Sequence, residues 1–122
     1  LFRSEPADIY ANPTYLPDDM QADYDRYWTD ARVDRVLDVL ERYGIALEIN
    51  ARYRIPSFGI IRRAKQRGIK FTFGTNNVDA DFGRLEYSLE AVEKCGLTAD
   101  DIWFPAMSVR RGRPVVLYNK FE

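Results

Sequence analysis

The sequence predicts an α/β fold in which one βα unit recurs along the chain. Short runs of β-branched and aromatic residues alternate with segments whose hydrophobic residues have helical spacing. Gly44, Gly68 and Gly96 follow the three predicted helices, at the position where a left-handed residue commonly ends a helix. Asn50 and Gly74 lie at one and the same distance after the first two glycines. Because repeated βα units join parallel strands through crossover helices, we expect a parallel sheet.

Hydrophobic periodicity places the individual elements. Strands are predicted in 8–12, 45–50, 68–74, 102–105 and 115–118, and helices in 29–43, 57–67 and 84–95. Each helix is expected to bury one hydrophobic stripe. The stripes consist, in chain order, of Val33, Val36, Leu37 and Leu40, of Phe58, Ile61 and Ala64, and of Leu85, Leu89 and Val92. The basic residues of the second helix, Arg62, Arg63, Lys65 and Arg67, are expected to form a solvated face.

Polar side chains follow the third predicted strand. Gly74 lets the backbone turn there, and Thr75, Asn76 and Asn77 come next without an apolar residue among them. In a sheet flanked by helices, ligands bind just past the carboxyl ends of the strands, so this cluster is a candidate binding site. A turn followed by a helix N-cap explains the same residues without any ligand, because asparagine is favoured in both.

Two further polar clusters end the first and second predicted strands. Asn12 and Thr14 flank Pro13, and Glu48 and Asn50 stand in the second strand. Alternation along that strand places both of them on one face, away from its apolar residues. A carboxylate in an otherwise buried strand needs a partner, which is either an arginine such as Arg52 or a set of amide donors. We expect Asn12, Glu48, Asn50, Asn76 and Asn77 to converge in one pocket.

The segment 15–28 mixes acidic residues with four aromatic rings, Tyr15, Tyr24, Tyr27 and Trp28. We expect an ordered loop or short helix that covers part of the molecule, because a loop of this size in a compact domain is usually functional.

Composition limits the class of protein. The 122 residues suit a single domain over 1–122, and the net charge of −1 argues against a nucleic-acid or anionic-membrane partner. No apolar run is long enough to span a membrane. The single Cys95 excludes an internal disulfide and fits a reducing, cytoplasmic compartment. Because the chain has no histidine, we expect no transition metal to be held by this segment alone.

Several motifs together resemble the C-terminal half of the PHP (polymerase and histidinol phosphatase) family. They are the segment 8–14, the strand end 46–50, the helix end 64–68 and the strand with its polar end, 70–77. The order and spacing of these motifs carry most of the resemblance, which covers roughly residues 8–104. It implies a seven-stranded barrel similar to a TIM barrel, in which divalent metal ions at the strand ends support hydrolysis of phosphate esters.

The resemblance also shows where this chain departs from the family pattern. Asn12 stands where the family has a histidine before proline, Asn76 where it has a metal-binding aspartate, and Val78 where it has a last histidine. These substitutions remove most of the attraction for a dication. The other metal ligands of the family lie in its N-terminal half, so the metal cofactor and the catalytic residues stay unknown here. With material for about half a barrel, the chain is expected to need a missing N-terminal segment or a second copy to close its sheet.

The expected function is therefore that of a PHP-like, metal-dependent phosphoesterase domain or fragment. The alternative is a non-catalytic ligand-binding or structural domain of the same fold. In either case the expected ligand is a small polar or phosphorylated molecule. Its predicted binding residues are Asn12, Thr14, Glu48, Asn50, Thr75, Asn76 and Asn77.

Overall fold

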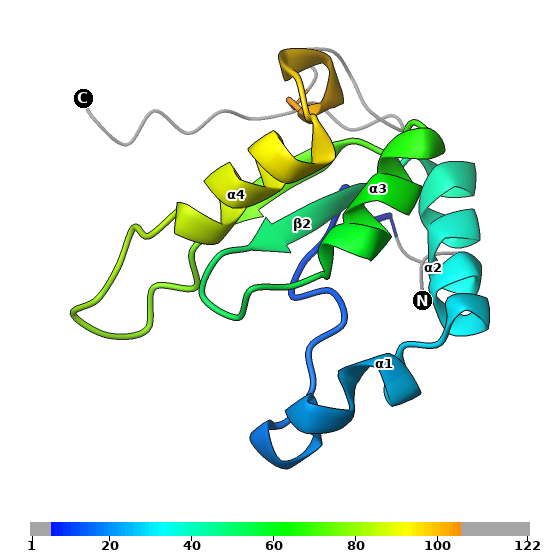
Figure 1. Ribbon diagram of the computed structural model, residues 1–122. Coiled ribbons are helices and arrows are strands. Elements are labelled where there is room, and N and C mark those ends of the chain that lie inside the picture. Colours follow the sequence, from blue (N-terminus) through cyan, green and yellow to red (C-terminus); the bar gives the residue numbers. More distant parts are fainter. Residues whose placement is uncertain (1–5, 106–122) are drawn as a thin grey trace, which may run out of the picture.

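A computed structural model describes residues 6–105 and shows a mixed α/β fold (Figure 1). Its strands are β1 (Ile9–Tyr10), β2 (Ala46–Asn50) and β3 (Phe71–Gly74). Its helices are α1 (Tyr24–Tyr27), α2 (Asp30–Tyr43), α3 (Phe58–Gln66) and α4 (Glu86–Cys95), with short 3-10 helices η1 (Asp18–Asp23) and η2 (Ala99–Asp101). The three predicted helices and the first three predicted strands are thus present, although the first strand keeps only two residues and the third only four. The predicted strand 102–105 is not formed. The predicted strand 115–118 lies outside the described residues.

The strands form one parallel sheet in the order β1-β2-β3, as the repeated βα unit predicts. Ile9 pairs with Ala46, and Leu47 pairs in turn with Phe71. A single parallel bridge joins Phe71 to Ile102, so of the predicted strand at 102–105 only its first residue pairs with β3. Neighbours in the sheet are therefore also neighbours in the sequence.

The core lies between the sheet and the three longer helices. Helices α2, α3 and α4 stand on the same side of the sheet (Figure 1). The strand residues that face them are Leu47, Ile49 and Phe71, which alternate with the polar positions as predicted. The helices contribute the predicted buried residues Val33, Leu37, Leu40, Ile61 and Ala64. Burial of this continuous apolar layer is the main stabilising contribution to such a fold.

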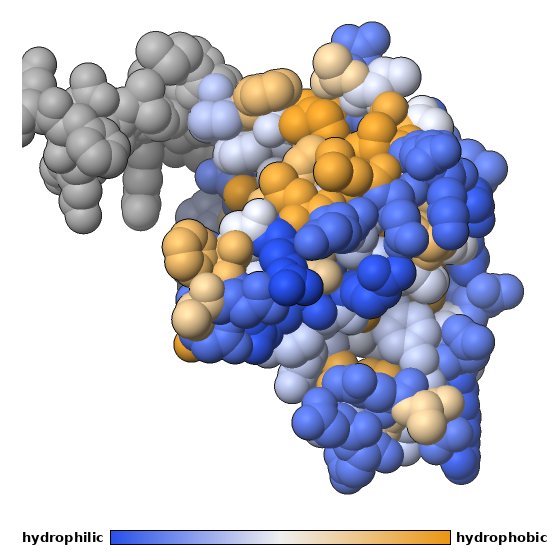
Figure 2. Space-filling view, turned by 60° about the vertical axis from the view of Figure 1, so that its left-hand side comes forward, coloured by the Kyte–Doolittle hydropathy of each residue, from blue (hydrophilic) through white to orange (hydrophobic). Residues whose placement is uncertain are grey.

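The predicted stripe of α4 is wrong for two of its three residues. Leu89 is 65% exposed and Leu85 lies before the helix, whereas Val92 packs against the core as predicted. Tyr87, Ala91 and Cys95 face the core instead. Apolar side chains also gather on part of the exposed surface, as Figure 2 shows. Residues 87, 91 and 95 follow one another at intervals of a helical turn, so α4 carries a second candidate stripe on another face. The small side chain of Ala91 allows close packing, and the Tyr87 hydroxyl reaches the Pro56 carbonyl oxygen.

Phe73 is another departure from the expected burial. In the sequence of the third strand, Ile69, Phe71 and Phe73 alternate with Lys70 and Thr72, which predicts that these three apolar side chains are buried. In the structure Phe73 is 40% exposed. The strand edge explains this difference. Ile102 pairs with Phe71 only, so the later residues of β3 have no described neighbour on their outer side.

The basic face of α3 is also not simply solvated. Arg63 binds Asp30 and Asp34 of α2 at 2.6 Å each, and Arg67 binds Asp34 at 2.8 Å and also Asp38. These pairs connect the two helices along their length. The acidic residues of α2 and the basic residues of α3 therefore fix how the two helices lie on the sheet.

Candidate ligand-binding site

Three loops meet at the carboxyl end of the sheet: 11–29 after β1, 51–57 after β2 and 75–85 after β3. Among the described residues, four that are not glycine have a positive φ, and all four lie in these loops. They are Asn12 (47°), Thr14 (63°), Arg54 (53°) and Asn76 (47°). Such backbone conformations cost energy unless the surroundings hold them, and they gather at functional sites.

Asn12, Glu48 and Asn50 form one hydrogen-bonded cluster. The Asn12 backbone N–H donates to Glu48 Oε1 at 3.1 Å, and Asn50 Nδ2 donates to the same oxygen at 2.9 Å. Asn50 Nδ2 also donates to Asn12 Oδ1 at 2.9 Å. The Glu48 carboxyl group lies so close to Gly74 that a Cβ there would stand 2.5 Å from it. The cluster therefore ties together the ends of all three strands.

The partner of Glu48 is a set of amide donors, which is one of the two expected arrangements. Arg52 is not that partner, because its guanidinium binds the carboxylate of Asp79 at 2.7 Å. This pairing holds the pKa of the Asp79 carboxyl group below its usual range. Gly74 has a different role from the one expected. Its φ is not positive, and the close approach of Glu48, rather than a turn, is what requires the absence of a side chain.

Asn50 also shapes the loop after β2. Its side chain is fully buried, and its Oδ1 accepts the backbone N–H of Tyr53 at 3.0 Å. Its backbone forms a bridge with Ile55. These bonds close the loop into a tight bend and hold Tyr53 and Arg54 at its tip. Asn50 therefore acts as a positioning residue for that loop.

Thr14 anchors the loop after β1 to the start of α3. Its buried hydroxyl lies 2.6 Å from the Tyr24 hydroxyl, whose oxygen accepts the backbone N–H of Ser57 at 3.3 Å. Burial raises the pKa of the Tyr24 hydroxyl above that of an ordinary phenol. Loop 11–29 is thereby fixed over loop 51–57.

The remaining predicted residues, Thr75, Asn76 and Asn77, have no side-chain hydrogen bond to this cluster within the described part of the chain. Asn77 is exposed, and its Oδ1 accepts the backbone N–H of Gly83 at 2.8 Å, which closes loop 75–85. Thr75 lies on the wall of a groove, and Asn76 is half-buried. The structure thus brings Asn12, Glu48 and Asn50 together, and within residues 6–105 no hydrogen bond joins them to Asn76 or Asn77.

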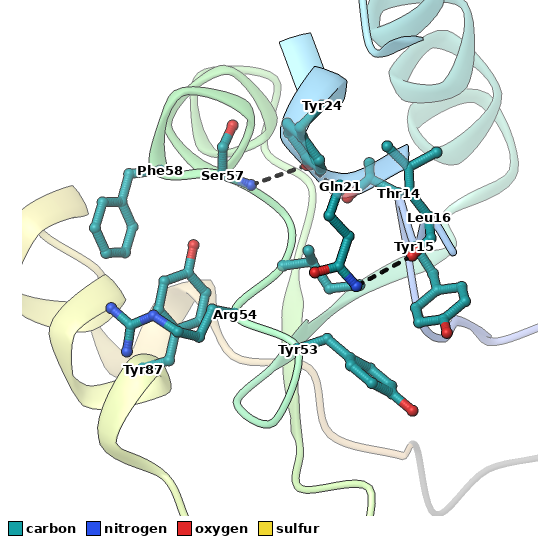
Figure 3. A pocket seen from close by; sticks show the side chains of 11 residues that line it. Thr14, Tyr15, Leu16, Gln21, Tyr24, Tyr53, Arg54, Ser57, Phe58 and Tyr87 are labelled. Atoms are coloured by element: carbon teal, nitrogen blue, oxygen red, sulfur yellow. Dashed lines mark hydrogen bonds between the residues drawn. The ribbon is translucent and has the colours of Figure 1, made fainter. Parts of the chain in front are cut away.

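Two adjoining hollows open at this end of the sheet. The larger, here called the strand-end groove, has a volume of about 690 Å³ and runs between loops 51–57 and 75–85. The smaller, here called the aromatic pocket, has a volume of about 330 Å³ and lies between loops 11–29 and 51–57 (Figure 3). Both are lined by Gln21, Tyr53, Arg54 and Tyr87. The two hollows therefore adjoin at these side chains.

Three arginines line the strand-end groove, and each has a carboxylate partner. Arg52 pairs with Asp79 at 2.7 Å, Arg54 with Glu90 at 2.8 Å and Arg84 with Asp81 at 2.6 Å. All these side chains are substantially exposed to solvent. Water screens such pairs, so each one contributes little and can exchange its partner.

The aromatic pocket is built from rings that are held by hydrogen bonds or by stacking. Tyr87 donates its hydroxyl to the Pro56 carbonyl oxygen at 2.6 Å, and burial raises the pKa of this phenol far above its usual value. Phe58 stacks on Tyr87 with the ring centroids 5.0 Å apart, and Arg54 lies 4.8 Å over the same ring. Tyr15 and Tyr53 meet edge to face at 4.8 Å.

Sequence reasoning overlooked most of the residues that line these hollows. Tyr53 and Arg54 stand directly after the second strand, and Arg84 precedes the fourth helix, so their position at a strand end was the available signal. Tyr87 gave no such signal, because it lies inside a helix. The expectation that segment 15–28 covers something agrees with its position, since Tyr15, Leu16, Gln21 and Tyr24 line the aromatic pocket.

The described residues do not fit the metal centre that the PHP resemblance implies. Among residues 6–105, no group of three or more His, Cys, Asp or Glu side chains is placed to hold a metal ion. Glu48 is the one carboxylate in the hydrogen-bonded cluster, and its Oε1 already accepts two hydrogen bonds. In the same range, none of the helices is both long and apolar enough to cross a membrane.

Comparison with known proteins adds no relative. No family model, no curated protein and no solved structure matches this chain significantly.

Proposed function

We propose that this chain is part of a PHP-like barrel domain and binds a small polar or phosphorylated molecule in the strand-end groove. The observation that carries this proposal is the groove itself, which lies past the carboxyl ends of β2 and β3 and is lined by Arg52, Arg54, Arg84 and Thr75. In parallel α/β folds this end of the sheet is where ligands bind. The resemblance to a family that acts on phosphate esters supports the same ligand class.

Two features of the sheet support the barrel. The strands are parallel and follow the sequence order, and the longer helices lie on one side only. In an open doubly wound sheet the helices would cover both faces, whereas in a barrel they form the outer layer. In this proposal a further segment of the protein, or a second copy, completes the barrel.

The side chains of the groove are better suited to bind a phosphorylated ligand through the arginines than a cation through the carboxylates. A guanidinium group binds phosphate through two parallel hydrogen bonds, which are stronger than an exposed ion pair. Arg52, Arg54 and Arg84 can therefore turn from their present partners to a phosphate group. The Thr75 hydroxyl is a neutral donor beside them.

Metal-dependent hydrolysis of phosphate esters is the second candidate, and the resemblance alone favours it. Because the described residues offer no metal-binding group, its ligands would have to come from other parts of the protein. The non-catalytic reading therefore rests on more of the described structure. A cytoplasmic location belongs to either version of the proposal, on the basis of the single free Cys95.

Titration calorimetry with inorganic phosphate and pyrophosphate tests the proposal. We expect saturable binding, and we expect Arg84→Gln to weaken it about tenfold, which is typical for loss of one charge-assisted hydrogen bond. Arg35→Gln, on the exposed surface of α2, is the matched control and should leave binding unchanged. Equal affinities of both variants, or no binding at all, would contradict the proposal. Release of nitrophenol from nitrophenyl phosphate on addition of manganese would favour the hydrolase version.

A further inference from the structure

We infer that the aromatic pocket binds a planar aromatic ring that is attached to the anionic group held in the strand-end groove. The ligand would then be an aromatic phosphate monoester rather than a free phosphate or an aliphatic one. This inference rests on the proposed function for its anionic half. Its aromatic half rests on the pocket alone.

The first argument is the composition of the walls. Five of the residues that line the pocket carry aromatic rings: Tyr15, Tyr24, Tyr53, Phe58 and Tyr87. Figure 3 shows Phe58, Tyr87 and Arg54 on one side of the pocket and Tyr15 and Tyr53 on the other. Aromatic rings prefer offset stacking or edge contacts with another ring, so a planar ring between these walls would gain contacts on both of its faces.

The second argument is that the walls are already in place. The hydroxyls of Tyr24 and Tyr87 bind Ser57 and Pro56 respectively, which fixes their rings without a ligand. Thr14, which holds the Tyr24 hydroxyl, accepts a positive φ of 63° to do so. A pocket that is formed in advance loses little conformational entropy when it binds.

The third argument is that ring surface remains accessible. Tyr15 is 44% exposed and Tyr53 is 36% exposed, although both are large and partly apolar. The pocket volume of about 330 Å³ lies at the small end of the range for ligand sites, which suits one ring and its substituents. The pocket is thus too small for an extended chain and large enough for a single ring system.

The fourth argument is the junction with the groove. Gln21, Tyr53, Arg54 and Tyr87 line both hollows, so the two hollows adjoin at these side chains. The Arg54 guanidinium stands over the Tyr87 ring and binds Glu90 at its other side. It is therefore placed between the ring position in the pocket and the anion position in the groove.

Competition among four small molecules tests the inference: inorganic phosphate, cyclohexyl phosphate, phenyl phosphate and phenol. We expect phenyl phosphate to bind about tenfold more tightly than inorganic phosphate and about threefold more tightly than cyclohexyl phosphate, since stacking adds to the burial of apolar area. Tyr15 lines the aromatic pocket but not the groove. Tyr15→Ala should therefore weaken phenyl phosphate about fivefold and leave inorganic phosphate unchanged.

The outcomes separate the two proposals. If inorganic phosphate binds but phenyl phosphate is no tighter, the inference is overturned and the proposed function stands. If phenyl phosphate and cyclohexyl phosphate bind equally, the pocket does not select aromatic rings and the inference is again overturned. If phenol binds and Tyr15→Ala weakens it while inorganic phosphate does not bind, the ring site is supported and the phosphate site is refuted. Circular dichroism of Tyr15→Ala confirms that a loss of binding is not a loss of folding.

Discussion

The chain changes direction sharply at both ends of the sheet, but the residues that make the turns differ between the two ends. At the amino end, short connections lead from helix to strand, and glycines with positive φ end α2 and α4 at Gly44 and Gly96. At the carboxyl end, loops 11–29, 51–57 and 75–85 are longer, and four residues with side chains adopt positive φ values there in addition to Gly83. Thr14 is the extreme case, because a β-branched residue rarely adopts this conformation.

The difference concerns what each turn residue contributes besides the turn. Glycine adopts a left-handed conformation at little energetic cost, but it supplies no side chain to a binding site. Thr14 and Arg54 keep side chains that line the aromatic pocket, at the expense of backbone energy. At the carboxyl end, residues with positive φ therefore also provide side chains that line the pocket, whereas the glycines that end α2 and α4 at the amino end provide none.

The largest expected effect is at Asn50, the centre of the carboxyl end. Asn50→Asp places a second carboxylate beside the Glu48 oxygen that Asn50 now donates to, and it does so in a fully buried position. We expect a loss of about 3 kcal/mol in the free energy of unfolding at pH 7. Urea denaturation measures it. Asn77→Asp is the matched control with little effect, because a carboxylate can also accept the Gly83 N–H.

The pH dependence sharpens this prediction. Burial and the neighbouring carboxylate raise the pKa of the introduced carboxyl group in the folded state above its unfolded value of about 3.9. The loss in the free energy of unfolding that Asn50→Asp causes then has its full size at pH values above the raised pKa. It shrinks as the pH falls through that value, because the protonated group can again donate to Glu48. An equal penalty at pH 4 and pH 7 would instead indicate a packing defect.

A glycine from each end gives the second comparison. Gly74→Ala should cost about 2 kcal/mol, because its methyl group would meet the Glu48 carboxyl group. Gly44→Ala should cost about 1 kcal/mol, because only its backbone conformation opposes a side chain and the space around it is open. Combining each glycine substitution with Glu48→Ala distinguishes a penalty caused by contact with Glu48 from one caused by the backbone conformation.

In that double-mutant cycle, removal of Glu48 should relieve most of the penalty at Gly74 and none of it at Gly44. Thermal or urea denaturation of the three single and two double variants measures the coupling. Additivity at Gly74 would show that the close approach to Glu48 does not explain this glycine.

The smallest expected effect is at Arg67, which follows α3 near the amino end and binds Asp34 and Asp38 of α2. Arg67→Gln should cost about 1 kcal/mol at low ionic strength and less at high salt, because these pairs are partly exposed. Arg35→Gln is the control on the same helix pair. A cost that does not change with salt would assign the effect to packing of the arginine stem rather than to its charge.

Much of the fold was predictable because its signals are local. Helical spacing and glycine ends located α2 and α3, and alternation correctly put Leu47 and Ile49 on the core side of β2. The α4 stripe was mispredicted because that helix carries apolar residues on two faces. Which face packs on α3 depends on the neighbouring helix, and the spacing of Leu85 and Leu89 contains no information about it.

The candidate site was predictable only in part for a similar reason. Parallel strands bring their carboxyl ends together, so the convergence of Asn12, Glu48 and Asn50 followed from strand order. The ion pair between Arg52 and Asp79 did not follow from strand order. Asp79 lies in a different loop, and long side chains pair with whichever opposite charge lies close to them in space.

By itself, the sequence determined the order of the elements, the parallel pairing of the strands and the end at which polar groups gather. These properties follow from periodicity and turn residues that act over a few neighbouring positions. The tertiary structure alone decided that Tyr15, Tyr53, Phe58 and Tyr87 line one pocket, and that this pocket adjoins a groove lined by arginines. Those residues come from three separate segments, and their contacts exist only once the loops have packed against one another.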